Sequence, residues 1–441
     1  MDTQKTNFTI ITLIASLGGV LFGFDMAVIS GILPLLHKQY SFTPAMEGWL
    51  VSSALVGCIL GVMASGVLSD RFGRKKMLGL SAAIFLVSAA GSALSADLDM
   101  LIAFRIVGGL GVGIASNVVP LYISEIAPVD KRGRLVSLYQ LAITLGILMA
   151  YLFNSLLLNY GMNQVATAES GWLDLLFVKE MWRGMFLVGI IPSTLYLLGS
   201  IIVPESPRWL LRNDAALTNQ GDEKLKGEGR LYQVMLSKEM RKPLLLGILL
   251  PLFSQLSGIN AIIYYGPRIL GGAGLDLSNA LHAQIFFGLA NVLFTMIAIW
   301  KVDSLGRRPL YLIGSLGAAL SLTLVSIHFF VGFETGLFLG ILVILFLMCF
   351  ACSIGPLKFV IVSEIFPDHI RGRAMAMSIM VMWLSDTIIG QITPMLLSLS
   401  TGLTFGIFAT CCFAAFLTVF KIYPETKGKT FEQIQSIWNK S

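Results

Sequence analysis

Residues 48–69 read GWLVSSALVGCILGVMASGVLS, and residues 70–76 continue as DRFGRKK. The first stretch contains no charged side chain, and a helix needs about 20 apolar residues to cross the hydrocarbon core of a bilayer. The second stretch is rich in Lys and Arg, which is typical of a loop on the cytoplasmic side of a membrane. Together they predict a membrane-spanning helix that ends in a cytoplasmic loop.

The composition of the whole chain agrees with this local pattern. Of its 441 residues 56% are hydrophobic and 13% are charged, whereas a soluble domain carries about 25% charged residues. This excludes a soluble globular enzyme and a disordered chain. The net charge of +6 does not indicate nucleic-acid binding, because the basic residues lie between apolar runs. The four histidines show no metal-ligand spacing, and no phosphate-binding loop is present, so we expect no metal, no cofactor and no ATP drive.

Twelve windows are long enough to cross a membrane. Eight contain no Asp, Glu, Lys or Arg: 48–69, 77–96, 135–158, 184–203, 243–267, 277–300, 310–333 and 402–420. Four more contain a single internal charge each: 8–34 with Asp25, 100–123 with Arg105, 336–363 with Lys358 and 373–398 with Asp386. With the N-terminus inside, 25 of the 31 basic residues fall in cytoplasmic segments, so we expect both termini to be cytoplasmic.

The sequence repeats itself. Residues 124–134, SEIAPVDKRGR, return as residues 363–373, SEIFPDHIRGR, with seven identities in eleven positions. Residues 70–75 likewise return at 303–308, and Pro204-Glu-Ser-Pro returns as Pro424-Glu-Thr-Lys. We therefore predict an N-terminal six-helix half over 1–203, a cytoplasmic linker with short helices over 204–242, and a C-terminal half with a cytoplasmic tail over 243–441. Parallel repeats of this kind place a binding site near the midplane and let one half rock against the other.

With these motifs in place, the chain resembles the sugar porter family of the major facilitator superfamily from end to end. The resemblance is carried by residues 18–31 (GGVLFGFDMAVISG), 105–109 (RIVGG), 204–209 (PESPRW), 255–260 (QLSGIN) and 424–428 (PETKG), together with the Gly-Arg motifs at 73–75 and 306–308. It implies the major facilitator fold, all-α with twelve spans in two pseudo-symmetric halves. It also implies a monosaccharide transporter that works by alternating access as a monomer in the cell (inner) membrane.

When the rise per helical residue is counted along each span, Asp25 and Arg105 lie at similar depth in the outer half of the membrane. This makes them a plausible ion pair. By resemblance they occupy the positions of the family's proton-coupling aspartate and its arginine partner. A conformational change that separates them would bind a proton. The alternative is a static pair that only pins two helices together. Gly189 stands where coupled members often carry a glutamate.

Lys358 and Asp386 are possible cavity charges. One hypothesis pairs them across two spans at the floor of the sugar cavity, and another frees Lys358 to bind an anionic substrate such as a sugar acid. The alternative is a lysine stem that reaches the inner membrane interface.

Uncharged amides and aromatic rings inside apolar helices are typical of sugar sites. By resemblance the sugar ligands and walls are Gln140, Gln255, Asn260, Asn291, Phe22, Tyr264, Trp383 and Phe359. The alternative role for an amide is a hydrogen bond between helices. Four positions depart from the family pattern: Ser254, Phe359, Met382 and Ile147.

A cytoplasmic gate is predicted from charged residues that recur in both halves: Glu125, Arg132, Glu364, Arg371, Arg74, Asp303 and Arg307. By resemblance they form salt bridges between the halves, and the alternative is exposed charge that only sets topology. Separately, Gly109 and Gly113 have the GxxxG spacing that suits close helix packing.

The sequence thus predicts a sugar transporter, not an enzyme, that carries a monosaccharide with protons through the bilayer by way of Asp25 and Arg105. The alternatives are an uncoupled facilitative carrier and, less favoured because the tails are short, a sugar sensor on a transporter scaffold.

Overall fold

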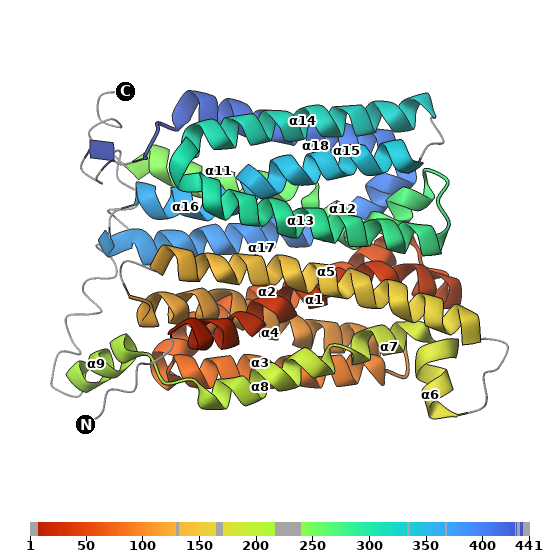
Figure 1. Cartoon of the computed structure of the whole chain (residues 1–441), viewed down its shortest axis with the longest axis horizontal. Coiled ribbons are helices and arrows are strands. Elements are labelled where there is room, and N and C mark those ends of the chain that lie inside the picture. Colours follow the sequence, from red (N-terminus) through yellow and green to blue (C-terminus); the bar gives the residue numbers. More distant parts are fainter. Residues whose placement is uncertain are drawn as a thin grey trace. The chain divides into compact units, whose positions relative to one another are not determined.

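The computed structural model describes residues 8–128, 132–164, 171–216, 240–332, 336–366, 368–427, 429 and 433–434. Every regular element in these ranges is helical, and twelve helical segments are long and apolar enough to span a membrane (Figure 1). The predicted all-α membrane fold with twelve spans is therefore confirmed.

The first six spans are built from helices that follow the predicted windows closely. They are α1 (Phe8–Tyr40), α2 (Pro44–Phe72), α3 (Arg74–Ala93), α4 (Leu98–Ile126), α5 (Arg132–Gln164), and α7 (Met181–Leu187) with α8 (Ile190–Ile202). Before and after this last pair stand the short α6 (Trp172–Asp174), the π-helical turn η2 (Leu175–Lys179) and α9 (Pro207–Ala216).

The last six spans are equally helical but more often interrupted. They are α11 (Arg241–Leu256) with α12 (Ile259–Gly271), α13 (Leu277–Leu305), α14 (Arg307–Val331), α15 (Gly336–Cys349) with the π-helical turn η4 (Phe350–Ile354) and α16 (Gly355–Ile365), α17 (Asp368–Leu399), and α18 (Thr401–Ile422).

Local sequence signals set the helix ends. The Thr43 hydroxyl accepts a hydrogen bond from the Met46 amide (3.3 Å) and Pro44 begins α2, while the Asp97 carboxylate accepts one from the Met100 amide (2.8 Å) at the start of α4. These caps satisfy amide groups that the first helical turn leaves without partners.

Close helix packing in the first half depends on the predicted glycines. A Cβ added at Gly109 would lie 1.9 Å from the carbonyl oxygen of Ala54, and one added at Gly113 would lie 2.2 Å from that of Cys58. Since neither distance is sterically possible, α4 can approach α2 this closely only where side chains are absent. The GxxxG prediction is confirmed.

The chain forms two compact units. Unit 1 contains residues 1–211, 261–292 and 390–395, and unit 2 contains residues 212–260, 293–389 and 396–441. Helices α12, α13 and α17 therefore each contribute residues to both units. The division into halves at 203 and 243 follows the internal repeat and stays a prediction.

The structure also differs from the windows in the continuity of three spans. The seventh span, expected as one helix over 243–267, is interrupted between α11 and α12, where Gly258 adopts a φ of 84° that favours glycine. The sixth span is interrupted between α7 and α8, and the tenth contains η4. Interrupted spans free backbone groups to bind ligands, which is common in transporters.

Candidate functional site

In unit 1, Asp25 on α1 and Arg105 on α4 form the ion pair that the sequence predicted. The Arg105 guanidinium donates to Oδ2 of Asp25 at 3.0 Å and to its backbone oxygen at 3.2 Å. It also lies over the Phe186 ring, 5.9 Å from the centroid. The arginine is 1% exposed, so its charge is balanced by protein groups rather than by solvent.

A small cavity lies beside this pair. It is lined by Leu21, Phe24, Asp25, Val28, Phe85, Ala89, Phe186, Gly189 and Ser193. Asp25 is the one carboxyl group in this lining, and Gly189 adds no side chain where the resemblance led us to look for a glutamate. Any proton that reaches this cavity therefore meets a single acceptor of the carboxylate type.

In unit 2, two sets of hydrogen bonds and the charge interaction between Lys358 and Asp386 form a buried polar group. We call it the Asp386 cluster; its members are Ser254, Gln255, Asn260, Lys358 and Asp386. The amide nitrogen of Asn260 donates to Oδ1 of Asp386 at 2.6 Å and to Oε1 of Gln255 at 3.3 Å. Gln255 lies near the end of α11 and Asn260 near the start of α12, so the break at Gly258 brings the two predicted sugar amides together.

Lys358 enters the Asp386 cluster from α16. Its ammonium group donates to the Ser254 hydroxyl at 2.9 Å, and its charge interacts with that of Asp386 on α17. Lys358 is 8% exposed and Asp386 is 3% exposed. Lys358 is therefore buried against side chains of unit 2, which favours the pairing hypothesis over a lysine stem that reaches the membrane interface. Ser254, one of the positions that departs from the pattern of the resemblance, is thus the acceptor of the lysine.

The other predicted sugar residues are found in both units. In unit 1, the Tyr264 hydroxyl lies 3.6 Å from Sδ of Met26, Asn291 is buried, and Gln140 and Phe22 are half-buried. In unit 2, Trp383 is buried on α17, while the Phe359 side chain is outside the described part of the chain. Their roles as sugar ligands stay predictions.

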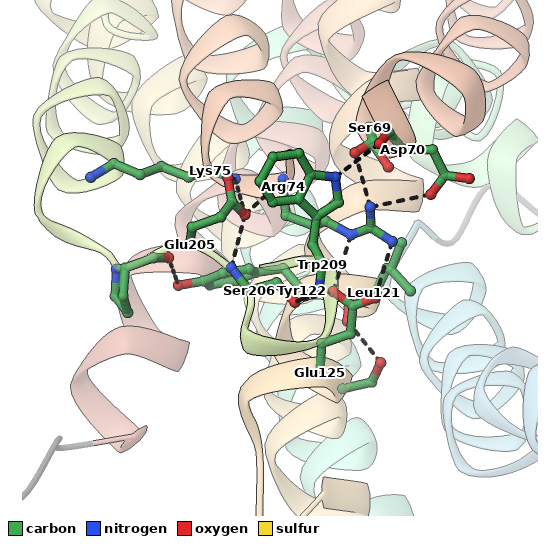
Figure 2. Close-up of polar contacts among 12 residues, drawn as sticks. Ser69, Asp70, Arg74, Lys75, Leu121, Tyr122, Glu125, Glu205, Ser206 and Trp209 are labelled. Carbon is green, nitrogen blue, oxygen red and sulfur yellow. Dashed lines mark hydrogen bonds and ion pairs between the residues drawn. The ribbon is translucent and has the colours of Figure 1, made fainter. Parts of the chain in front are cut away.

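At one end of unit 1, Arg74 organises a charged cluster (Figure 2). Its guanidinium makes two parallel contacts with Glu125, at 3.0 and 3.1 Å, and also contacts Asp70 at 3.2 Å. Glu205 accepts hydrogen bonds from the backbone amides of Arg74 and Lys75. We call Arg74, Asp70, Glu125 and Glu205 the Arg74 cluster; its arginine and Glu125 are 5% and 8% exposed.

Unit 2 builds the same arrangement from the repeated sequence. Arg307 contacts Glu364 at 3.0 Å, and Glu425 accepts from the backbone amides of Arg307 and Arg308 at 3.2 and 3.1 Å. The Thr426 hydroxyl donates to Glu364 at 2.6 Å, as that of Ser206 does to Glu125. We call Arg307, Glu364, Glu425 and Thr426 the Arg307 cluster. The repeat of Pro204-Glu-Ser as Pro424-Glu-Thr therefore corresponds to matching hydrogen bonds in the two units.

The predicted gate is only partly visible. The side chains of Arg132, Arg371 and Asp303 are outside the described part of the structure. The two observed pairs, Arg74 with Glu125 and Arg307 with Glu364, each join residues of a single predicted half. Salt bridges between the halves stay a prediction.

The sequence did not single out a further ion pair, which lies in unit 1 between Glu47 on α2 and Arg268 on α12. The arginine also donates to the backbone oxygen of Pro394 at 3.3 Å, and Gln391 bridges Ser52 (2.8 Å) and the backbone oxygen of Ala45 (2.9 Å). An acidic residue in the first turn of a helix is ordinary, because it favours the helix dipole. The unusual feature is that Glu47 is only 7% exposed, and this burial is visible only in the three-dimensional structure.

These observations define a class of protein. Twelve helical spans, an internal repeat whose two copies build matching clusters, interrupted spans and buried charges inside the membrane segments are the organisation of a secondary transporter.

Comparison with known proteins gives the family. The sequence model described as sugar (and other) transporter matches residues 11–438. The chain is 39% identical over 452 residues to the arabinose-proton symporter of Bacillus subtilis (strain 168), covering 98% of this chain and 95% of that protein. It is 34% identical over 492 residues to the D-xylose-proton symporter of Escherichia coli (strain K12), covering 99% and 97%. The chain belongs to the sugar (and other) transporter family.

Solved structures show the same fold. A crystal structure of D-xylose-proton symporter superposes with a TM-score of 0.79 at 34% identity, covering 96% of this chain and 99% of that one. The inward open conformation of the xylose transporter XylE from E. coli superposes with a TM-score of 0.78, covering 97% and 99%. The protein is thus a multi-pass membrane transporter of the major facilitator fold.

Proposed function

We propose that this protein carries a monosaccharide across the cell membrane together with protons, by alternating access. The observation that carries the proposal is the Asp25–Arg105 pair, a carboxylate and a guanidinium held at 3.0 Å inside two membrane spans, with a cavity beside the carboxylate. Similarity to proteins named as arabinose-proton and D-xylose-proton symporters supports both the cargo and the coupling ion.

The coupling follows from electrostatics. While Arg105 contacts Asp25, the guanidinium stabilises the ionised carboxylate. If a conformational change moves the two apart, a charged carboxylate in an apolar surrounding is costly, so Asp25 takes up a proton. Return of Arg105 expels the proton. Sugar binding that favours one of the two conformations then links sugar movement to proton movement.

The sugar is recognised by Gln140, Gln255, Asn260 and Asn291, with Phe22, Tyr264, Trp383 and Phe359 as its apolar walls. Both termini face the cytoplasm and the transporter works as a monomer in the inner membrane. The Arg74 and Arg307 clusters then lie on the cytoplasmic side, and the Glu47–Arg268 pair lies on the outer side.

The experiment is uptake into proteoliposomes of radiolabelled pentoses, hexoses and sugar acids, with and without an inward proton gradient. We expect accumulation above equilibrium for at least one neutral sugar, and we expect Asp25→Asn to abolish the accumulation while leaving exchange. Asp99→Asn is the matched control, because it makes the same change at an exposed position in the first turn of α4.

The outcomes separate the alternatives. Equilibration of the sugar that is unchanged by the proton gradient and by Asp25→Asn indicates a facilitative carrier. Sugar binding without uptake indicates a sensor. Absence of both sugar binding and uptake overturns the proposal.

A further inference from the structure

The Asp386 cluster contains more charge than a sugar site requires, and its hydrogen bonds indicate what that charge does. We propose that Asp386 is a positioning residue that fixes the side-chain amide of Asn260, with Lys358 as its counter-charge, so that the site presents an acceptor from Asn260 beside a donor from Gln255. This inference rests on the proposed function, because it assigns the substrate chemistry of the same site.

The first step is the direction of the hydrogen bonds. An ionised carboxylate can only accept, so the group of Asn260 that lies 2.6 Å from Asp386 must be its NH2. The same NH2 reaches the side-chain oxygen of Gln255 at 3.3 Å. Both donors of Asn260 are thereby engaged within unit 2. What Asn260 retains for a ligand is its carbonyl oxygen, and what Gln255 retains is its NH2.

The second step is the contrast with a neutral residue. If residue 386 were an amide, it could donate to Asn260 as well as accept from it, so both orientations of Asn260 would be satisfied. The negative charge removes that freedom. Asp386 therefore acts on the substrate through Asn260.

The third step is the charge balance. Asp386 is 3% exposed, and a lone charge buried that deeply is strongly destabilising. Lys358, 8% exposed, supplies the opposite charge and is itself anchored by the Ser254 hydroxyl at 2.9 Å. The lysine is thus explained by the carboxylate and not by an anionic substrate.

The substrate class follows. A neutral polyol fits, because one hydroxyl can donate to Asn260 while a neighbouring oxygen accepts from Gln255. A sugar acid whose carboxylate takes the place of the donating hydroxyl offers only acceptors there and cannot satisfy the carbonyl oxygen of Asn260. We therefore expect neutral sugars to bind at least roughly tenfold more tightly than the matching sugar acids, the usual penalty for one unsatisfied buried polar group.

The binding test uses the purified full-length protein and calorimetric titration of a transported sugar with its singly fluorinated analogues. Fluorine accepts weakly but cannot donate. In the wild type, fluorine in place of the donating hydroxyl should weaken binding roughly tenfold. In Asp386→Asn, where the Asn260 amide can turn, the same replacement should cost threefold or less. Ser385→Ala is the control, because the Ser385 hydroxyl bonds the carbonyl of Val381 on its own helix.

A second measurement needs no sugar. We expect Lys358→Met and Asp386→Asn each to lower the melting temperature by several degrees, and the double variant to recover most of the loss because it contains no unpaired charge.

The outcomes are distinct. Additive losses overturn the charge pair. An unchanged fluorine penalty in Asp386→Asn, or tight binding of a sugar acid, overturns the positioning role. A wild type that binds no sugar refutes the proposed function and the substrate role of Asn260 together, while the melting cycle still decides whether the two charges pair.

Discussion

Two pairs of buried charges, one in each compact unit, are held differently. In unit 1, Arg105 contacts the carboxylate of Asp25 directly at 3.0 Å. In unit 2, Asp386 bonds Asn260 and Lys358 bonds Ser254, so each charge is tied to a neutral polar side chain as well as to its counter-charge. A pair whose two charged groups contact each other directly can be separated and re-formed as the charge changes. A pair that is tied into neighbouring side chains is better suited to hold them in place.

The Arg74 and Arg307 clusters show a related difference. Arg74 and Glu125 are 5% and 8% exposed, whereas Arg307 and Glu364 are 15% and 26% exposed. The same repeated motif is therefore more deeply buried in unit 1. Burial raises both the strength of an ion pair and the penalty for breaking it, so equal substitutions in the two units should have unequal effects.

The largest expected effect is a difference between the two buried cations, Arg105 and Lys358. Arg105→Met should abolish gradient-driven accumulation, because Asp25 loses the partner that expels its proton. Lys358→Met should retain accumulation, at higher sugar concentrations, because it disturbs recognition and not coupling. Uptake with and without a proton gradient measures both, with the exposed Lys179→Met as control. Equal loss of accumulation in the two variants would contradict the assignment of coupling to Arg105 and of substrate recognition to Lys358.

The next effect compares the two copies of the motif. Arg74→Met leaves the buried Glu125 without its counter-charge and should lower the free energy of unfolding by about 3 to 5 kcal/mol. Arg307→Met should cost about 1 to 2 kcal/mol, because Glu364 is 26% exposed and keeps solvent as a partner. Chemical unfolding in detergent measures both values. A larger loss in Arg307→Met would contradict the link between burial and pair strength.

A smaller effect is expected on the local opening of the contact between Glu47 and Arg268, because the arginine is 32% exposed and solvent can replace part of its interaction. Arg268→Met should loosen the contact between α12 and α2 by about 1 kcal/mol, or about fivefold in an opening equilibrium. The measurement is the labelling rate of Met26→Cys, next to Tyr264, by an impermeant maleimide added from outside, with the native cysteines replaced. An unchanged rate would mean that the pair does not hold this end of unit 1 closed.

The smallest effect is expected at a fully exposed charge. Asp276 accepts from the backbone amides of Asn279 and Ser278 at the start of α13, and these hydrogen bonds, above all those from Asn279, lower the pKa of its carboxyl. A lowered pKa in the folded state means that the stabilisation is complete above the ordinary value of 3.8 and is lost as the pH falls below it. Asp276→Ala should lower the melting temperature by about one degree at neutral pH. The difference should shrink as the pH falls below 3.8.

Much of this molecule could be predicted from its sequence, because the bilayer imposes a strong length and polarity requirement. The spans, the Asp25–Arg105 pair and the close approach at Gly109 follow from patterns within one or two segments. The contacts of Lys358 do not, because the acceptor of its ammonium group depends on how α16 is rotated against α11. The break at Gly258 is likewise invisible to hydropathy, since a single glycine in an apolar run leaves the average unchanged.

The π-helical turn η4 has a consequence for the rotation of the helix that follows it. A π turn holds one residue more than an α turn, so everything from Gly355 onward is rotated by about 100° relative to a continuous α-helix. Lys358 lies only four residues beyond the turn, and its direction is set by that offset. Removing one residue from 350–354 would restore a regular helix and swing the lysine about a quarter of a circle away from Ser254. The position of the Lys358 charge in the Asp386 cluster thus depends on the number of residues in η4 as well as on their chemistry.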